Sequence, residues 1–98
     1  MSQFFVDFRI PQPLTQEFVS LIPAHRARVN ELMSQGKILS YSLAMDRSRV
    51  WAVVQAASVE DAETIADSLP LSPYMHWDVH ELMFHNSVQL ALPAMSMN

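Results

Sequence analysis

The chain has 98 residues, enough for one domain with a modest hydrophobic core. Its formal net charge of −4 argues against nucleic acid or an anionic membrane as the main partner. It contains no cysteine, which excludes disulfides and thiolate sites, and no apolar run long enough to cross a bilayer, so we expect a cytoplasmic protein.

The first half of the chain predicts a strand followed by an interrupted helix. Residues 3–10 alternate between two faces, as a strand does. Thr15 is a suitable N-cap for the helix, and Gly36 stands where a left-handed C-cap is expected. Pro23 predicts a kink, or a fresh helix start with Pro23 in the first turn. The apolar stripe at helical spacing comprises Phe18, Leu21, Ile22, Val29, Leu32 and Met33.

The middle of the chain predicts a hairpin and a second helix. Residues 37–45 and 49–57 are typical of strands, and the short polar turn at 46–48 joins them. Ser58 begins a helix over 59–69 with acidic residues in its first turn. The inner stripe of this helix comprises Ala62, Ile65, Ala66 and Leu69.

The end of the chain predicts a last strand and an apolar tail. Residues 74–83 alternate, which completes a ferredoxin-like βαββαβ domain of the α+β class, with an antiparallel sheet, over residues 1–85. Both faces of this sheet are largely apolar and need a cover, so two sheets are expected to pack together as a dimeric α/β barrel. Residues 86–98 are too apolar for a solvated extension, and we expect them to pack on a neighbouring subunit.

The junction between the second helix and the last strand carries a resemblance to a known family. Leu69-Pro70-Leu71 is followed by Pro73-Tyr74-Met75, with His85 and a serine-containing tail about ten residues later. This pattern resembles the muconolactone delta-isomerase family, and the likeness extends loosely over residues 3–88. The resemblance implies a dimeric α/β barrel, higher assemblies of such dimers, a small-molecule substrate, no cofactor, and double-bond migration in aromatic-compound degradation.

His25 is the first candidate for catalysis. It lies in the middle of the apolar stripe of its helix, so it points toward the sheet. Burial lowers the pKa of a histidine, which leaves a neutral imidazole able to accept a proton. The alternative is a core histidine bonded to a carbonyl or to Tyr41. By resemblance, the family carries an acidic residue next to a lysine on this turn, where this chain has His25 and Arg26.

Arg26 and Arg28 flank this histidine and are candidates for substrate binding. A guanidinium can hold a carboxylate through paired hydrogen bonds. Arg28 lies closer to the apolar stripe, so we expect it rather than Arg26 in a pocket. The alternative for either arginine is a solvated helix face with Glu31 nearby.

Three polar residues alternate along the last predicted strand. His76, Asp78 and His80 share one face because side chains alternate along a strand. They could hold one metal ion, form the polar wall of a substrate pocket, or face solvent or an interface.

Aromatic residues and a histidine complete the set of candidates. Tyr41 and Trp51 could line an aromatic cavity or belong to the core. In the reaction that the resemblance implies, Tyr41 or His76 could donate a hydrogen bond to the oxygen of an enolate intermediate. His85 matches a histidine near the tail of the family by position, and it could close the pocket of an adjacent subunit.

The resemblance, together with these candidate residues, implies a cofactor-independent isomerase that moves a double bond in a small unsaturated lactone or carboxylated ring. His25 would be the base, and no metal is required. Three alternatives stay open. The first is a binding protein on the same dimeric barrel without turnover, and the second is a metal-dependent enzyme that uses the histidines of the last strand. The third is a cofactor-free oxygenase on a related barrel.

Overall fold

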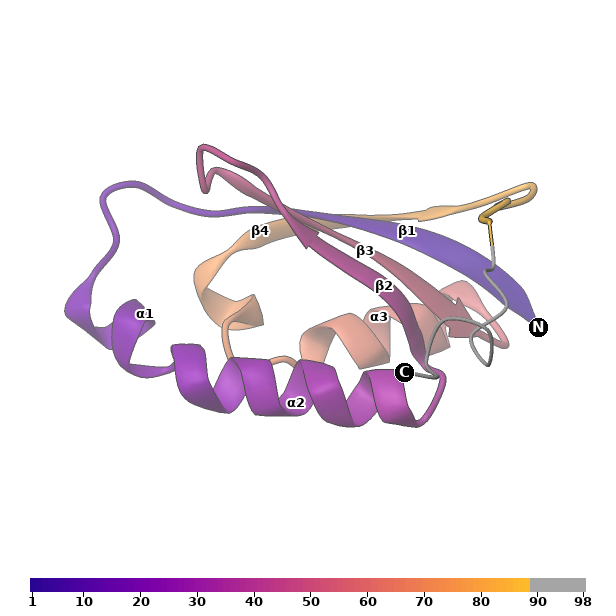
Figure 1. Cartoon of the computed structure of the whole chain (residues 1–98), viewed down its shortest axis with the longest axis horizontal. Helices are drawn as coiled ribbons and strands as arrows, with labels where there is room; N and C mark the ends of the chain where they lie inside the picture. The colour runs from indigo at the N-terminus through magenta and orange to yellow at the C-terminus, as the bar shows by residue number, and fades with distance from the viewer. Residues whose placement is uncertain (89–98) are drawn as a thin grey trace, which may run out of the picture.

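The computed structural model describes residues 1–88 and contains a four-stranded antiparallel sheet with helices packed on one face (Figure 1). In chain order the elements are β1 (Ser2–Arg9), α1 (Gln16–Ser20), α2 (Ile22–Ser34), β2 (Ile38–Leu43), β3 (Arg49–Ala56), α3 (Val59–Asp67), the 3-10 turn η1 (Ser72–Tyr74) and β4 (His76–Glu81). The strand order is β2-β3-β1-β4, and all three pairings are antiparallel. This is the predicted ferredoxin-like βαββαβ fold.

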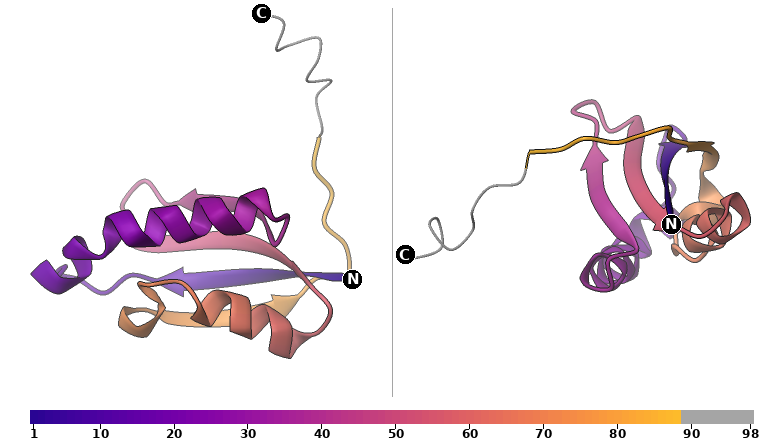
Figure 2. Two further views of the ribbon diagram at one scale, coloured as in Figure 1. Left: turned by 90° about the horizontal axis from the view of Figure 1, so that it is seen from below. Right: turned by 90° about the vertical axis from the view of Figure 1, so that its right-hand side faces the viewer.

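The hydrophobic core lies between the sheet and the two longer helices. Figure 2 shows α2 and α3 side by side across the same face of the sheet; α2 contacts β2, while α3 contacts the other three strands. Alternation along β1 sends Phe4, Val6 and Phe8 into this core, where each is almost fully buried. The stripe of α3 also packs there, as predicted, with Ala62 and Ala66 buried.

Pro23 divides the first helical segment in two. Helix α1 begins after Thr15, whose Oγ1 accepts the backbone N–H of Phe18 at 3.1 Å. It ends at Ser20, and α2 starts at Ile22 with Pro23 in its first turn. Proline is tolerated there because the first N–H groups of a helix have no partner within it. The predicted N-cap and fresh helix start are both confirmed.

Gly36 ends α2 in a left-handed conformation, with φ of 74°. The N–H of Gly36 donates to the Met33 carbonyl at 3.0 Å, and the N–H of Lys37 donates to the Leu32 carbonyl at 2.9 Å. These two bonds form a Schellman motif, which satisfies carbonyls at the end of the helix. The predicted left-handed C-cap is confirmed.

Replacing Gly36 by alanine is expected to lower the free energy of unfolding by about 1 kcal/mol. No atom lies within 4 Å of the position of an added Cβ, so the cost comes from the positive φ rather than from a clash. Urea denaturation measures this cost. The neighbour Gln35, with φ of −86°, provides the control, and equal stabilities of Gly36→Ala and Gln35→Ala would contradict the prediction.

Strand β2 contains an irregularity that changes which of its side chains face the helices. Ile38 pairs with Val54 and Ser40 pairs with Val53, so Leu39 is an extra residue on the β2 side. Strict alternation would place Ile38 and Tyr41 on opposite faces, because they are three residues apart. The bulge turns both of them toward the helices, and bulges commonly re-aim side chains in this way.

The last strand is shorter than predicted. Tyr74 belongs to the 3-10 turn rather than to a strand, and β4 runs only from His76 to Glu81 instead of over residues 74–83. Pro73 explains the difference, because its fixed φ fits the first turn of a helix and it cannot donate to a strand ladder. The predicted tail begins beyond β4, and its residues 89–98 lie outside the described part of the chain.

The outer face of the sheet carries both apolar and charged side chains. Phe5 and Trp51 are half-buried on it. Two ion pairs lie beside them: Arg9 with Asp78 at 2.9 Å and Arg49 with Asp7 at 2.7 Å. The packing of two such faces into a barrel stays a prediction. Among residues 1–88 no helix combines the length and apolarity that crossing a bilayer requires.

Candidate active site

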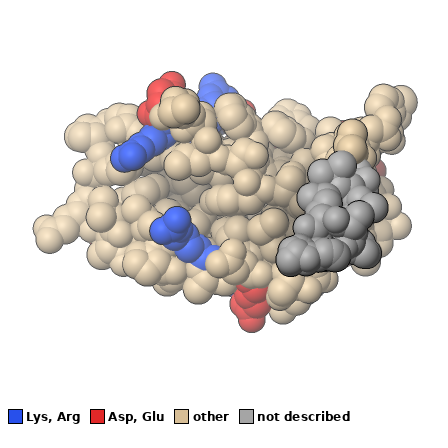
Figure 3. Space-filling model, in the orientation of Figure 1, with Lys and Arg blue, Asp and Glu red and all other residues tan. Residues whose placement is uncertain are grey.

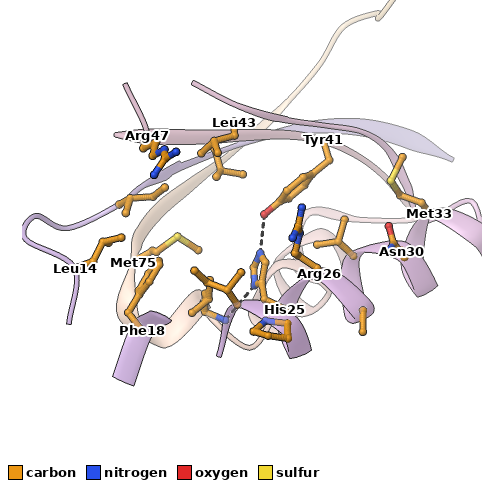
Figure 4. Close-up of a pocket in the computed structure, with 17 residues that line it drawn as sticks. Leu14, Phe18, His25, Arg26, Asn30, Met33, Tyr41, Leu43, Arg47 and Met75 are labelled. Carbon is orange, nitrogen blue, oxygen red and sulfur yellow. Dashed lines mark hydrogen bonds between the residues drawn. The ribbon is translucent and has the colours of Figure 1, made fainter. Parts of the chain in front are cut away.

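A pocket of about 1130 Å³ opens between α2 and the inner face of the sheet at the β2–β3 end. Most of its wall is apolar, including Leu14, Phe18, Ile22, Val29, Leu43, Val50, Leu71 and Met75. Its polar lining residues are His25, Arg26, Asn30, Tyr41 and Arg47 (Figure 4). A largely apolar cavity with a few polar groups is typical of a small-molecule site.

His25 and Tyr41 form a hydrogen-bonded pair inside this pocket. Helix α2 points His25 toward the sheet, as its place in the apolar stripe predicts, and the side chain is 5% exposed. The bulge in β2 points Tyr41 toward the helix, and its hydroxyl lies 2.6 Å from Nε2 of the histidine (Figure 4). The bond to Tyr41 that the sequence offered as an alternative is present, and both side chains line the cavity.

The second ring nitrogen of His25 is held by the backbone. The N–H of Leu71, at the junction after α3, donates to Nδ1 at 3.2 Å. A backbone N–H can only donate, so Nδ1 carries no hydrogen and the neutral imidazole is protonated at Nε2. We therefore assign the bond between the two side chains as Nε2–H donating to the Tyr41 oxygen.

Burial shifts the pKa values of both members of the pair toward their neutral forms. It lowers the pKa of His25 below its usual 6.5, because the charged imidazolium loses water. It raises the pKa of Tyr41 to about 12, because a phenolate would lose water in the same way. The pair is therefore a neutral imidazole beside a neutral phenol at physiological pH.

The lowered pKa of His25 predicts that the fold loses stability in mild acid. Between the folded pKa and 6.5 the unfolded chain binds a proton that the folded chain does not. The contribution of neutral His25 to the free energy of unfolding is therefore fully present above pH 6.5 and decreases as the pH falls toward the pKa of the folded state. Urea denaturation at pH 7.5 and pH 5 should show this loss in the wild type and a smaller one in His25→Gln. Identical losses in both proteins would contradict it.

Two arginines give the pocket a positive charge. Arg26 lies beside the His25–Tyr41 pair, and Arg47 extends into the cavity from the β2–β3 turn (Figure 4). The described lining of the pocket contains no Asp or Glu, and neither arginine forms an ion pair within residues 1–88. In Figure 3, basic side chains stand on both the sheet side and the helix side of the hollow. The site is thus suited to an anionic ligand.

Arg28 is not in this pocket, contrary to the expectation from the sequence. Its Nη1 donates to Glu31 at 2.6 Å, and its Nε and Nη2 lie 3.4 and 3.3 Å from Ser68 Oγ at the end of α3. Two residues along a helix turn a side chain by about 200°, so Arg26 and Arg28 point to different sides of α2. Arg28 turns toward the end of α3 instead of the pocket, so closeness to the apolar stripe of α2 did not identify the pocket residue.

The polar residues of β4 lie on the opposite face of the sheet from His25. His76, Asp78 and His80 do share a face, as predicted, but they pair across to Arg9, Asp7 and Phe5, whose side chains point away from the helices. Trp51 is on this outer face as well, and His85 is exposed beyond the end of β4. None of the five predicted residues in this group lines the pocket of the protomer.

The alternative metal site on β4 is not formed. Within residues 1–88, no three side chains of Asp, Glu and His converge as metal ligands. Asp78, which would be the central ligand, bonds to Arg9, and that bond holds the pKa of Asp78 below its usual range. Equal spacing along one strand places the three side chains in a row rather than around a common point.

Sequence reasoning missed several pocket residues, and helical spacing could have found two of them. Asn30 and Met33 lie four and seven residues after Arg26, on the same side of α2. Met33 belongs to the predicted apolar stripe, but its side chain is 42% exposed and lines the pocket. Arg47, at positive φ in the β-turn, gives no such signal, because its contribution depends on how the hairpin curves over α2.

Comparison with known proteins places this chain in a family. Comparison with the curated proteins gives no match. Among solved structures, the chain is similar to the crystal structure of muconolactone isomerase at 3.3 Å resolution: the identity is 22%, the TM-score is 0.68, and the match covers 91% of this chain and 96% of that chain. At this identity the likeness shows a shared fold. The sequence model described as Muconolactone delta-isomerase matches residues 3–88. Because this match spans most of the sequence, the chain belongs to the muconolactone delta-isomerase family.

Proposed function

We propose that the protein is an isomerase that moves a double bond in a small unsaturated lactone or similar ring bearing a carboxylate. The observation that carries the proposal is the His25–Tyr41 pair, hydrogen-bonded inside an apolar pocket with Arg26 beside it. Family membership supports the same class of reaction. We further propose that the protein acts as a homodimer or larger assembly, with two sheets packed through their outer faces.

The proposed substrate class follows from the charges and the wall of the pocket. A ring of five or six atoms fits an apolar cavity of this size, and Arg26 or Arg47 would bind its carboxylate through paired hydrogen bonds. The low polarity of the wall strengthens such charged contacts, because few water molecules compete with them.

The proposed reaction needs stabilisation of an enolate. A base removes a ring proton next to the double bond, which places negative charge on the carbonyl oxygen of the lactone. The same base returns the proton at another carbon and so completes the migration. A donor already in place lowers the barrier, since charge develops on that oxygen in the transition state. His25 could act as that base only through Nδ1, because Nε2 already carries the hydrogen that it donates to Tyr41. Nδ1 would first have to release the Leu71 N–H.

Proton NMR of a carboxymethyl butenolide in deuterated buffer tests the proposal. We expect double-bond migration, or exchange of ring hydrogen for deuterium, that depends on enzyme concentration and is reduced in Arg26→Met. Arg28→Met is the matched control, because that arginine lies outside the pocket. Absence of migration and exchange with the wild type would overturn the isomerase proposal.

A second candidate is a small-molecule-binding protein without turnover. One observation favours it: within residues 1–88 the pocket has no carboxylate, and its histidine has no free nitrogen to act as base. Such a protein would bind the butenolide with an affinity that depends on Arg26 but would catalyse no exchange. Calorimetry together with the NMR assay separates these two functions.

A further inference from the structure

We propose that Tyr41 donates the hydrogen bond to the enolate oxygen of the ligand, and that His25 is a positioning residue that fixes the direction of that bond. The proposal rests on the proposed function and deepens it by assigning roles within the same pocket. It involves no proton transfer by Tyr41, which stays a phenol throughout.

The chain of hydrogen bonds begins at the backbone between α3 and β4. The Leu71 N–H follows Pro70 and precedes the 3-10 turn, so its direction is fixed by the local backbone. It donates to Nδ1 of His25, a contact between residues 46 positions apart in the sequence. Because that lone pair is used, the neutral ring must carry its hydrogen on Nε2.

The next hydrogen bond in the chain runs from His25 to Tyr41, again with the donor on the side of Leu71. Nε2–H donates to the phenolic oxygen at 2.6 Å, so the hydroxyl proton of Tyr41 cannot occupy that line. Within residues 1–88 the tyrosine hydroxyl has no other hydrogen-bond partner than His25. Its proton is therefore free to point into the cavity that Tyr41 lines (Figure 4). The pair presents a donor to the ligand rather than an acceptor.

The surroundings suit a donor to an anion. The pKa of Tyr41, raised to about 12 by burial, keeps the hydroxyl protonated at physiological pH. Arg26 lines the same cavity as Tyr41 and can bind the carboxylate of the same ligand (Figure 4). Donation from His25 also polarises the phenol, because hydrogen bonds in a chain strengthen one another. An enolate oxygen near Tyr41 would therefore meet a neutral, oriented donor.

Two substitutions of His25 separate positioning from proton transfer. The amide nitrogen of Gln reaches about as far as Nε2, so His25→Gln retains a donor to Tyr41. The amide oxygen of Asn lies near the place of Nδ1, so His25→Asn retains the acceptor for Leu71 but loses that donor. We expect Tyr41→Phe and His25→Asn each to lower kcat about 10²- to 10³-fold, and His25→Gln to lower it about tenfold or less.

Binding provides a readout that does not need turnover. The probe is a carboxymethyl tetronate, a lactone whose enol is ionised at neutral pH and which resembles the enolate. We expect Tyr41→Phe to weaken its binding about 10- to 100-fold by calorimetry. If the wild type catalyses no exchange but shows this Tyr41 dependence, the isomerase proposal fails while the donor role stands.

The tautomer itself is measured on the wild type by long-range ¹H–¹⁵N NMR, so misfolding of a variant cannot hide the answer. We expect His25 to be protonated at Nε2 alone, with and without the tetronate. A ring protonated at Nδ1 would overturn the proposal. So would a His25→Gln variant as inactive as His25→Asn, or a Tyr41→Phe variant with wild-type kcat and tetronate affinity.

Discussion

Arg26→Met is expected to weaken the binding of a carboxylated butenolide about 10- to 100-fold. A hydrogen bond to a charged group contributes about 1.5–3 kcal/mol, and 1.4 kcal/mol corresponds to a factor of ten in affinity. Arg26 is free to make such a bond, because it lines the pocket and forms no ion pair within residues 1–88. Methionine keeps an unbranched apolar stem about as long as that of arginine and removes the guanidinium group with its charge and donors. Isothermal titration calorimetry measures the change.

Arg28→Met is the matched control for this experiment. It removes the same charge from the same helix, only two positions away, so the net charge of both variants is equal. Arg28 is bound to Glu31 and Ser68 outside the pocket, and we expect its loss to change ligand affinity less than about twofold. Similar losses in the two variants would show that a general positive potential, rather than Arg26 itself, holds the carboxylate.

Phe4→Ala is expected to lower the free energy of unfolding by about 3–5 kcal/mol. Phe4 lies in β1, an inner strand of the sheet, and its side chain is 0% exposed between the sheet and the helices. Truncation removes buried apolar surface and leaves a cavity, and both effects destabilise the fold. For a domain with a total stability of about 5–15 kcal/mol this is a large fraction. Guanidinium denaturation monitored by circular dichroism measures it.

Phe5→Ala provides the control, because the same residue type on the same strand faces the other way. Its side chain is half-buried on the outer face of the sheet, so the loss within one protomer should be clearly smaller than that of Phe4→Ala. If two sheets pack through this face, the wild type should become more stable as its concentration rises. The difference in free energy of unfolding between the wild type and Phe5→Ala should then also increase with protein concentration. Equal losses at every concentration would contradict the assignment of the core face.

The local sequence determined most of the secondary structure of this protein. Alternation predicted β1 and the hairpin, and helical spacing predicted the buried faces of α2 and α3. Proline and glycine act on the backbone directly, which is why Pro23 and Gly36 were placed correctly as a helix start and a helix end. His25 was correctly predicted to face the sheet, because the period of a helix fixes which side chains share a face.

Only the tertiary structure decided which faces meet to form the site. The period of a strand shows that His76, Asp78 and His80 share a face, but the choice of face depends on their pairing with β1. Tyr41 reaches His25 because of the bulge in β2, and no local sequence pattern predicts the extra residue of that bulge. The Leu71 N–H meets His25 across 46 positions because the chain turns after α3 at that point. Local rules fix how each element forms, whereas contacts between elements depend on register and packing that no single segment contains.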